Sequence, residues 1–107
     1  MQTVSIEAKP GGVLDVVLSG EIDFTNAAHI VDVVREAIAG GCPETVRVDL
    51  AAVTFLDSSG LGVLIRAMKA AAAVDAAFRV EHPTEKVFDQ LQMTGLLAPF
   101  GIAETGG

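Results

Sequence analysis

The stretch from Thr45 to Leu64 reads TVRVDLAAVTFLDSSGLGVL and contains the passage from a strand to a helix on which the fold depends. Over Thr45 to Leu50, valine and leucine alternate with arginine and aspartate, a period of two that is typical of a half-buried strand. From about Ser59 to Ala73 the apolar residues recur instead at helical spacing. The sequence therefore predicts a strand that passes through residues 51–60 into a helix.

The helix predicted over residues 59–73 has one apolar stripe, which we expect to pack in the core rather than to bind a cofactor. The stripe consists of Leu61, Leu64, Ile65, Met68 and Ala72. Arg66 and Lys69 lie off the stripe and toward the C-terminal end of the helix, where cations complement the helix dipole.

Upstream of this stretch, the sequence predicts a hairpin and then an amphipathic helix. Strands are expected over Thr3 to Ala8 and Val13 to Ser19, because apolar residues recur there in strand-like patterns on either side of a Pro-Gly-Gly turn. Helical spacing returns from about Thr25 to Ala39. The pair Gly40-Gly41 is expected to provide the left-handed exit that commonly ends a helix.

Downstream, a short strand over Phe78 to Glu81 precedes a third helix, whose first turn accommodates Pro83. Gly95 is expected to end this helix, and a loose tail should follow over Glu104 to Gly107. The residues expected to pack inward in this region are Val87, Phe88, Leu91, Leu96, Leu97, Phe100 and Ile102.

The order strand, strand, helix, strand, helix, strand, helix predicts an α/β fold. The two strand–helix–strand units favour parallel neighbours and the hairpin adds an antiparallel pair, so we expect a mixed sheet of about four to five strands with about three to four helices. A chain of 107 residues is long enough for one hydrophobic core and too short for two. Residues 1–107 are therefore expected to form a single domain.

The net charge of −7 argues against binding to nucleic acid, which calls for clustered lysine and arginine. An acidic surface mostly serves solubility, and it can also steer a protein toward a basic partner. No apolar stretch reaches the roughly 18–20 residues of a membrane span, and the N-terminus lacks the pattern of a signal peptide. The single cysteine, Cys42, is interpreted as a buried or incidental thiol. We expect a cytoplasmic protein that does not associate with membranes.

The segment Asp57 to Gly62, DSSGLG, carries most of the functional information. Aspartate and serine are preferred at helix N-termini, where their side chains accept hydrogen bonds from unpaired backbone N–H groups. Capping is the leading interpretation for Asp57, whereas for Ser58 it competes evenly with a functional role. Two glycines near a helix start each cost about 1 kcal/mol relative to alanine, which indicates that another group approaches the backbone there.

A phosphoryl group on Ser58 would add about −1.5 to −2 charges at an exposed junction between loop and helix. A helix N-terminus tolerates an anion, so the fold should survive the modification. A partner packed against the same surface would be repelled. Phosphorylation could thus switch binding without unfolding the domain.

The run Val46 to Leu50 followed by Val53 to Leu64 resembles the signature of the STAS family, named for sulphate transporters and anti-sigma factor antagonists. Leu18 to Asp23, LSGEID, is similar to the L-x-G-E-[IL]-D segment of the family. Val87-Phe88 and Met93 to Leu96 extend the resemblance downstream, so that it covers nearly the whole chain.

The resemblance implies that Ser58 is a phosphoacceptor and that Ser59 is a cap or helix-start residue. It also implies a partner-binding surface, which would comprise Asp23, Asp57, Ser58, Ser59, Gly60, Leu61 and Gly62. For Asp23, a role as N-cap of the following helix is an equally weighted alternative.

The resemblance further implies a partner switch. The dephosphorylated domain would bind an anti-sigma factor that is also an ATP-binding serine kinase, and a sigma factor would be released. A metal-dependent serine phosphatase would reset the system. Apart from this resemblance, we expect the domain itself to need no cofactor and to be a monomer when free.

Enzymatic readings have little support. A serine hydrolase needs a positioned base, and His29 and His82 are the only histidines, neither in a recognisable catalytic setting. One cysteine and two scattered histidines show no metal-ligand spacing, and Gly60-x-Gly62 is neither a P-loop nor a dinucleotide fingerprint.

Within the STAS family, a scaffold of a stress-signalling assembly or a component of a lipid-transport system is the alternative. The Asp57 to Gly60 segment favours the switch.

Overall fold

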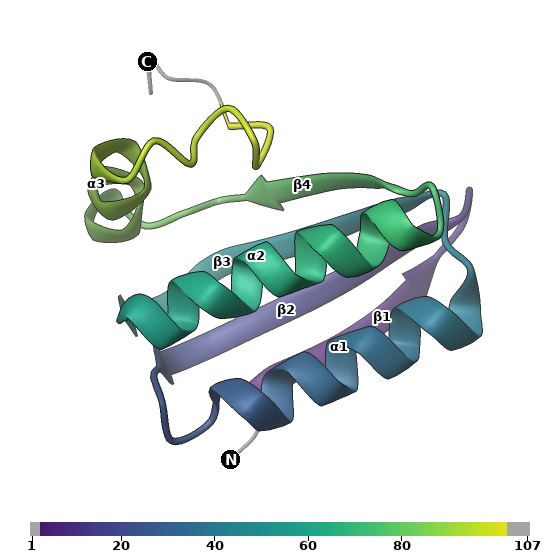
Figure 1. Cartoon of the computed structure of the whole chain (residues 1–107), viewed down its shortest axis with the longest axis horizontal. Helices are drawn as coiled ribbons and strands as arrows, with labels where there is room; N and C mark the ends of the chain where they lie inside the picture. Colours follow the sequence, from purple (N-terminus) through teal and green to yellow (C-terminus); the bar gives the residue numbers. More distant parts are fainter. Residues whose placement is uncertain (1–2, 103–107) are drawn as a thin grey trace.

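A computed structural model describes residues 3–102 as one four-stranded sheet with three helices (Figure 1). In chain order the elements are β1 (Val4–Lys9), β2 (Val13–Ile22), α1 (Ala27–Gly41), β3 (Thr45–Leu56), α2 (Ser58–Ala73), β4 (Ala77–Glu81) and α3 (Glu85–Met93). The predicted element order is confirmed.

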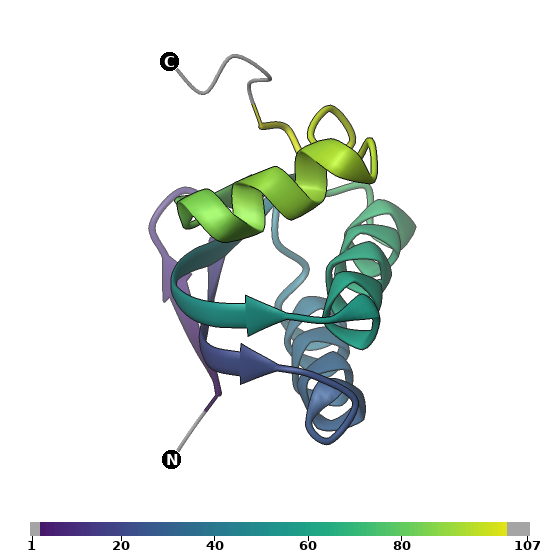
Figure 2. The same ribbon diagram turned by 90° about the vertical axis from the view of Figure 1, so that its left-hand side faces the viewer.

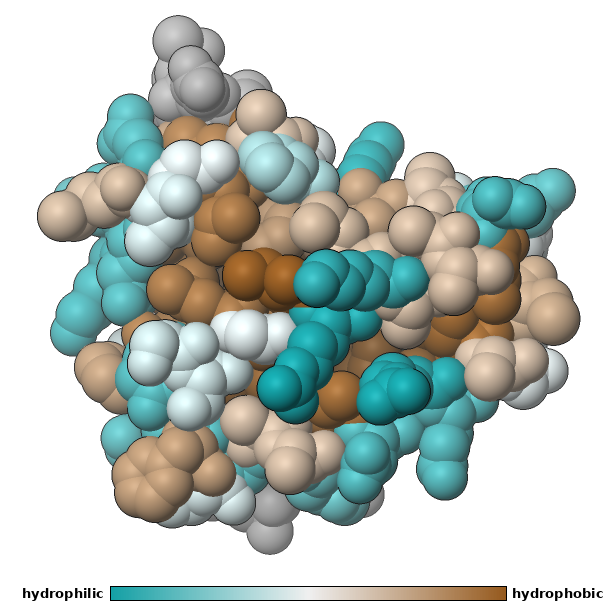
Figure 3. Space-filling view, in the orientation of Figure 1, coloured by the Kyte–Doolittle hydropathy of each residue, from teal (hydrophilic) through white to brown (hydrophobic). Residues whose placement is uncertain are grey.

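The strands lie side by side in the order β1-β2-β3-β4. β1 pairs antiparallel with β2, while β2, β3 and β4 are parallel, which confirms the predicted mixed sheet. Because both crossovers step in the same direction along the sheet, right-handed connections put α1 and α2 on the same face. Figure 2 shows these two helices as one layer beside the sheet, with α3 across the end of both layers. The outer surface of α1 and α2 faces the viewer in Figure 3.

Strands β2 and β3 are longer than the alternation of residues predicts. β2 continues past Ser19 to Ile22, and β3 continues past Leu50 to Leu56. The register between them shifts twice in this extension, and Gly20 there has a φ of +76°. Such irregularities break the period of two, which explains why the extension was missed. The consequence is that β2 and β3 end at the same edge of the sheet, with Ile22 opposite Leu56.

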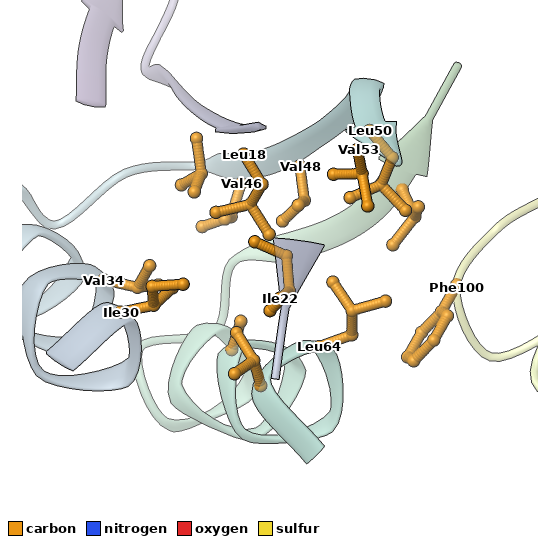
Figure 4. Close-up of a cluster of buried hydrophobic side chains, with 14 of the residues drawn as sticks. Leu18, Ile22, Ile30, Val34, Val46, Val48, Leu50, Val53, Leu64 and Phe100 are labelled. Carbon is orange, nitrogen blue, oxygen red and sulfur yellow. The ribbon is translucent and has the colours of Figure 1, made fainter. Parts of the chain in front are cut away.

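The core lies between the sheet and the layer of α1 and α2 (Figure 4). Its labelled members are Leu18, Ile22, Ile30, Val34, Val46, Val48, Leu50, Val53, Leu64 and Phe100, each at most 1% exposed. Burial of one such aliphatic side chain contributes about 1.5–3 kcal/mol, so the core holds the two strand ends in place.

The buried stripe of α2 differs from the predicted one. Its buried residues are Gly60, Val63, Leu64, Ala67 and Ala71. Ala72, predicted to be inside, is exposed, and Leu61, Ile65 and Met68 are only partly buried. In an alanine-rich helix, the largest side chains do not show which face is buried. Small residues allow the helix backbone to pack closely against its neighbours, so the buried face can be the one with glycine and alanine.

The end of α1 also differs from the expectation. Gly40 and Gly41 are still helical, and Cys42 adopts the left-handed conformation with a φ of 43°. Its backbone N–H donates to the Ile38 oxygen at 3.1 Å, which ends the helix. The Cys42 thiol is exposed, so of the two interpretations, a buried or an incidental thiol, the structure contradicts the buried one.

Helix α3 begins one residue after Thr84, whose hydroxyl caps it by accepting from the Val87 N–H at 3.3 Å. Pro83 therefore precedes the cap rather than lying in the first turn. At the other end Gly95, with a φ of +73°, follows the C-cap, and the Leu96 N–H donates to the Leu91 oxygen at 2.9 Å. This is the glycine-dependent ending that the sequence predicted.

The segment after α3 packs back onto the domain as expected. Leu97 and Phe100 are buried, and Leu96 and Ile102 pack against the core. The Val80 N–H donates to the Phe100 oxygen at 2.9 Å, so this segment covers the outer edge of β4. The predicted loose tail lies outside the described residues.

Candidate functional site

Two aspartates meet where the central strands end. Asp23 follows β2 directly, and Asp57 follows β3 directly. Parallel neighbouring strands end at the same edge of a sheet, and here the Asp57 N–H also donates to the Ile22 oxygen at 3.2 Å. The fold therefore brings together two predicted site segments that are 34 residues apart in the sequence.

Asp57 is the N-cap of α2, as predicted. Its Oδ1 accepts from the Gly60 N–H at 2.9 Å, and its backbone oxygen accepts from the Leu61 N–H at the same distance. Ser58 is the first residue of the helix, with an exposed side chain that makes no hydrogen bond within residues 3–102. Because Asp57 already caps the helix, capping does not account for Ser58. Ser59 is the second helical residue, which fits the expected helix-start role.

Gly60 is required by the close approach of the neighbouring strand end. A Cβ atom on Gly60 would lie 2.6 Å from the Ile22 oxygen and 2.7 Å from Cδ1 of Leu56. The expectation that a group approaches the backbone at this helix start is thus confirmed for Gly60. A Cβ on Gly62 would meet nothing within 4 Å.

Asp23 folds onto its own loop and does not cap α1. Its carboxylate accepts from both the backbone N–H, at 2.9 Å, and the hydroxyl of Thr25. The hydroxyl bond is the main reason that the pKa of Asp23 lies below its ordinary value. Asn26 occupies the N-cap position of α1, and its Oδ1 accepts from the Asp23 N–H at 3.0 Å. The N-cap interpretation of Asp23 was therefore wrong.

A shallow groove of about 320 Å³ lies between the first turns of α1 and α2. It is lined by Phe24, Ala27, Ala28, Val31, Ser58, Ser59, Gly62, Val63 and Arg66. Of the predicted partner-binding residues, Ser58, Ser59 and Gly62 line it, whereas Gly60 is buried and Leu61 packs partly against the core. Asp23 and Asp57 are not among the lining residues.

Phe24 was missed by the sequence analysis, although its position should have drawn attention. It is 78% exposed, at the edge of the groove that Ser58 lines. Phe24 lies two residues after the end of β2, between Asp23 and the polar residues Thr25 and Asn26, so its neighbours in the sequence favour an exposed loop. Exposed aromatic residues of this kind commonly anchor protein interfaces.

Gln90 of α3 was also missed. Its Nε2 donates to the Leu56 oxygen at 2.7 Å, immediately before Asp57, while its Oε1 is buried and has no hydrogen-bond partner within residues 3–102. The bond joins α3 to the end of β3.

In the part of the chain that the structure describes, the two histidines lie away from the groove that Ser58 lines. His29 is exposed on α1, and His82 follows β4, with its Nδ1 3.7 Å from Oδ1 of Asp49. Neither histidine lines the groove. Within residues 3–102 there is no group of three or more His, Cys, Asp or Glu side chains that could hold a metal ion, and no helix there is long and apolar enough to cross a membrane.

A family model for the STAS domain matches residues 6–106, and the chain belongs to this family. In sequence it is similar to the anti-sigma-B factor antagonist of Listeria monocytogenes, with 29% identity over 100 residues that cover 87% of this chain and 82% of the relative.

Solved structures of the anti-sigma factor antagonist SpoIIAA share the fold. The unphosphorylated form superposes with a TM-score of 0.78 at 26% identity, covering 91% of this chain and 84% of the other. The phosphorylated form of the Bacillus protein gives a TM-score of 0.71 at 25% identity, covering 91% and 86%. The resemblance to anti-sigma factor antagonists therefore rests on both sequence and fold.

Proposed function

We propose that this protein is an anti-sigma factor antagonist that binds an ATP-dependent anti-sigma factor kinase through the groove beside Ser58. Phosphorylation of Ser58 ends the interaction. The observation that carries the proposal is an exposed serine hydroxyl with no structural task, since Asp57 caps the helix in its place. The existence of a phosphorylated form of the relative SpoIIAA supports the same assignment.

The proposed modification is transfer of the γ-phosphoryl group of ATP to Oγ of Ser58. The bond between Oγ and phosphorus forms as the bond between phosphorus and the β-phosphate oxygen breaks, ADP leaves, and a base on the kinase takes the hydroxyl proton. This chain contributes the acceptor and its position, not a catalytic group. A separate serine phosphatase would hydrolyse the phosphoester and restore binding.

The geometry explains how one phosphoryl group could control binding. In the unmodified protein the groove is lined mostly by small and apolar residues together with Arg66, and Phe24 offers a large apolar anchor at its edge. A phosphoryl group on Ser58 would place up to two negative charges inside this contact. A partner packed on this contact would then have to exclude water from that anion, and an apolar or acidic partner surface would offer it no compensating charge, which costs affinity.

The fold is expected to tolerate the phosphoryl group. Ser58 lies at the positive end of the α2 dipole, where an anion is favoured. Its side chain is exposed, so the added group needs no rearrangement of the core. The switch would therefore act on the interface and leave the stability of the domain nearly unchanged.

The test is capture of partners from lysate of the native host by immobilised wild type, Ser58→Ala and Ser58→Glu proteins. We expect an ATP-binding, kinase-like protein on the first two and its loss on the third. Ser59→Ala is the matched control and should behave as wild type. Incubation of the purified pair with ATP should place phosphate on Ser58. Equal capture by all variants, or capture of a membrane transport complex, would contradict the proposal and favour a scaffold or lipid-transport role.

A further inference from the structure

The groove beside Ser58 continues along the full length of α1 and α2. Arg66, which lines the first cavity, also lines a second one of about 360 Å³ with Arg35, Lys69, Ala70 and Ala73. A third cavity of about 190 Å³ reaches the C-terminal ends of both helices at Ile38 and Val74. Since α1 has 15 residues, the combined groove is about 22 Å long.

The cations of this acidic protein fall into two groups. Three basic residues are in ion pairs: Lys9 with Glu7 at 3.4 Å, Arg47 with Asp15 at 2.7 Å, and Arg79 with Glu81 at 2.7 Å. Lys86 lies over the ring of Phe55, 5.8 Å from its centroid.

The remaining three cations, Arg35, Arg66 and Lys69, have no ion-pair partner within the part of the chain that the structure describes, and all three line the second cavity. In Figure 3, strongly hydrophilic side chains gather over the middle of the two helices, beside apolar surface. An unpaired cluster of three cations is notable in a chain of net charge −7.

The shape and the charge of the groove fit one kind of occupant. Its floor includes Ala39, Ala70 and Ala73, whose small side chains allow a backbone to approach closely. On α1, Asp32 and Glu36 line an adjoining cavity with Arg35 and Ala39, whereas the α2 wall of the groove carries the two cations Arg66 and Lys69. A helix of about 15 residues that carries carboxylates would match both the length and the charge.

We propose that this groove is a second docking subsite, occupied by an acidic helical segment of the same anti-sigma partner. The proposal rests on the proposed function and adds the partner's chemistry to it. Nucleic acid fits less well, because the overall negative charge of the protein repels a polyanion. The subsite adjoins the cavity beside Ser58, because Arg66 lines both, and it extends to Lys69, about three helical turns from Ser58.

The experiment uses the purified ATP-binding partner that Ser58→Ala captures. Arg66→Glu and Lys69→Glu each reverse one charge in the groove, and Lys9→Glu on β1 is the matched control with the same change in net charge. We expect each groove variant to weaken binding at least about tenfold and the control to stay within about twofold of wild type. Circular dichroism and thermal unfolding check that all variants fold.

A zero-length carbodiimide, which joins lysine amines to carboxylates, identifies the occupant directly. We expect Lys69 to cross-link to an aspartate or glutamate of the partner in preference to Lys9 and Lys86. Cross-links from Lys69 to a second copy of this chain would overturn the proposal. Unchanged affinity of the groove variants would overturn it as well, while the Ser58 switch would stand. If no kinase-like partner binds Ser58→Ala, the proposed function itself fails.

Discussion

The two central strands end in the same way and continue differently. Each of β2 and β3 is followed at once by an aspartate and leads to a helix on the same face of the sheet. After β3 the helix starts immediately, with Asp57 as its cap and Ser58 as its first residue. After β2 a short loop intervenes, Asp23 binds Thr25, and α1 starts only at Ala27.

The two ways of entering a helix place two different kinds of residue at the surface. The direct entry places Ser58 at a helix N-terminus, where an anion is favoured. The looped entry leaves Phe24 outside the core, where it can meet a partner. Asp57 thus caps a helix, whereas Asp23 accepts hydrogen bonds within a turn, although both directly follow a strand in a strand–helix crossover. The following predictions test this contrast, from the largest expected effect to the smallest.

Gly60→Ala should destabilise the domain by about 1–3 kcal/mol, because the new methyl group would collide with the Ile22 oxygen and Leu56. The free energy of unfolding from urea denaturation measures this. Gly62→Ala is the matched control in the same helix and should stabilise by about 0.5–1 kcal/mol, since nothing lies near its Cβ. Equal effects at both positions would mean that the direct entry into α2 does not depend on close contact with β2.

Phe24→Ala should weaken binding of the kinase-like partner by about 2 kcal/mol, or roughly thirtyfold in affinity. The thermal midpoint should barely move, because the side chain is 78% exposed. Isothermal titration calorimetry and thermal unfolding together separate the two effects. Met93→Ala, which removes a comparably exposed side chain on α3, is the control and should leave binding intact. A loss of stability without a loss of affinity would assign Phe24 to the fold instead.

Asp57→Ala should destabilise the domain by about 1 kcal/mol through loss of the cap on α2. Asp57→Asn retains an oxygen that can accept from the Gly60 N–H and should recover most of the difference. Asp23→Ala removes no helix cap, so amide exchange in the first turn of α1 should change less than exchange in the first turn of α2 does in Asp57→Ala. The opposite order would contradict the contrast between the two strand ends.

The hydrogen bond from the Thr25 hydroxyl is the largest cause of the lowered pKa of Asp23, ahead of the backbone N–H bonds of Thr25 and Asn26. In Thr25→Val, which keeps the shape and removes the hydroxyl, the pKa measured by NMR titration should rise toward the ordinary aspartate value. Because the folded pKa is depressed, the contribution of this turn is present above the unfolded pKa and is lost as the pH falls through the folded pKa. An unchanged pKa in the variant would indicate that the backbone N–H bonds dominate.

Several parts of this arrangement could be read from the sequence because their causes are local. Alternation and helical spacing located the elements, and the Asp57 to Gly60 segment indicated a capped helix start. Gly95 predicted the end of α3, since a left-handed residue is needed there. The parallel crossovers followed from the element order alone.

Other parts depend on contacts between distant segments and left no local pattern. The irregular pairing near Gly20 interrupts the alternation of residues, so the sequence did not predict the extension of β2 and β3. Because α2 is rich in alanine, the positions of its large apolar side chains did not predict which face of the helix is buried. The bond from Gln90 to the Leu56 oxygen spans 34 residues, and the cationic groove exists only because α1 and α2 lie side by side.

The most direct test of the account compares the affinity of the kinase-like partner for the unphosphorylated protein and for the protein phosphorylated only on Ser58. Isothermal titration calorimetry at one salt concentration provides both values. The account predicts that phosphorylation weakens binding at least about a hundredfold, while circular dichroism and the thermal midpoint stay nearly the same. Equal affinities for the two forms, or loss of the folded state on phosphorylation, would contradict the claim that Ser58 switches an interface on an unchanged fold.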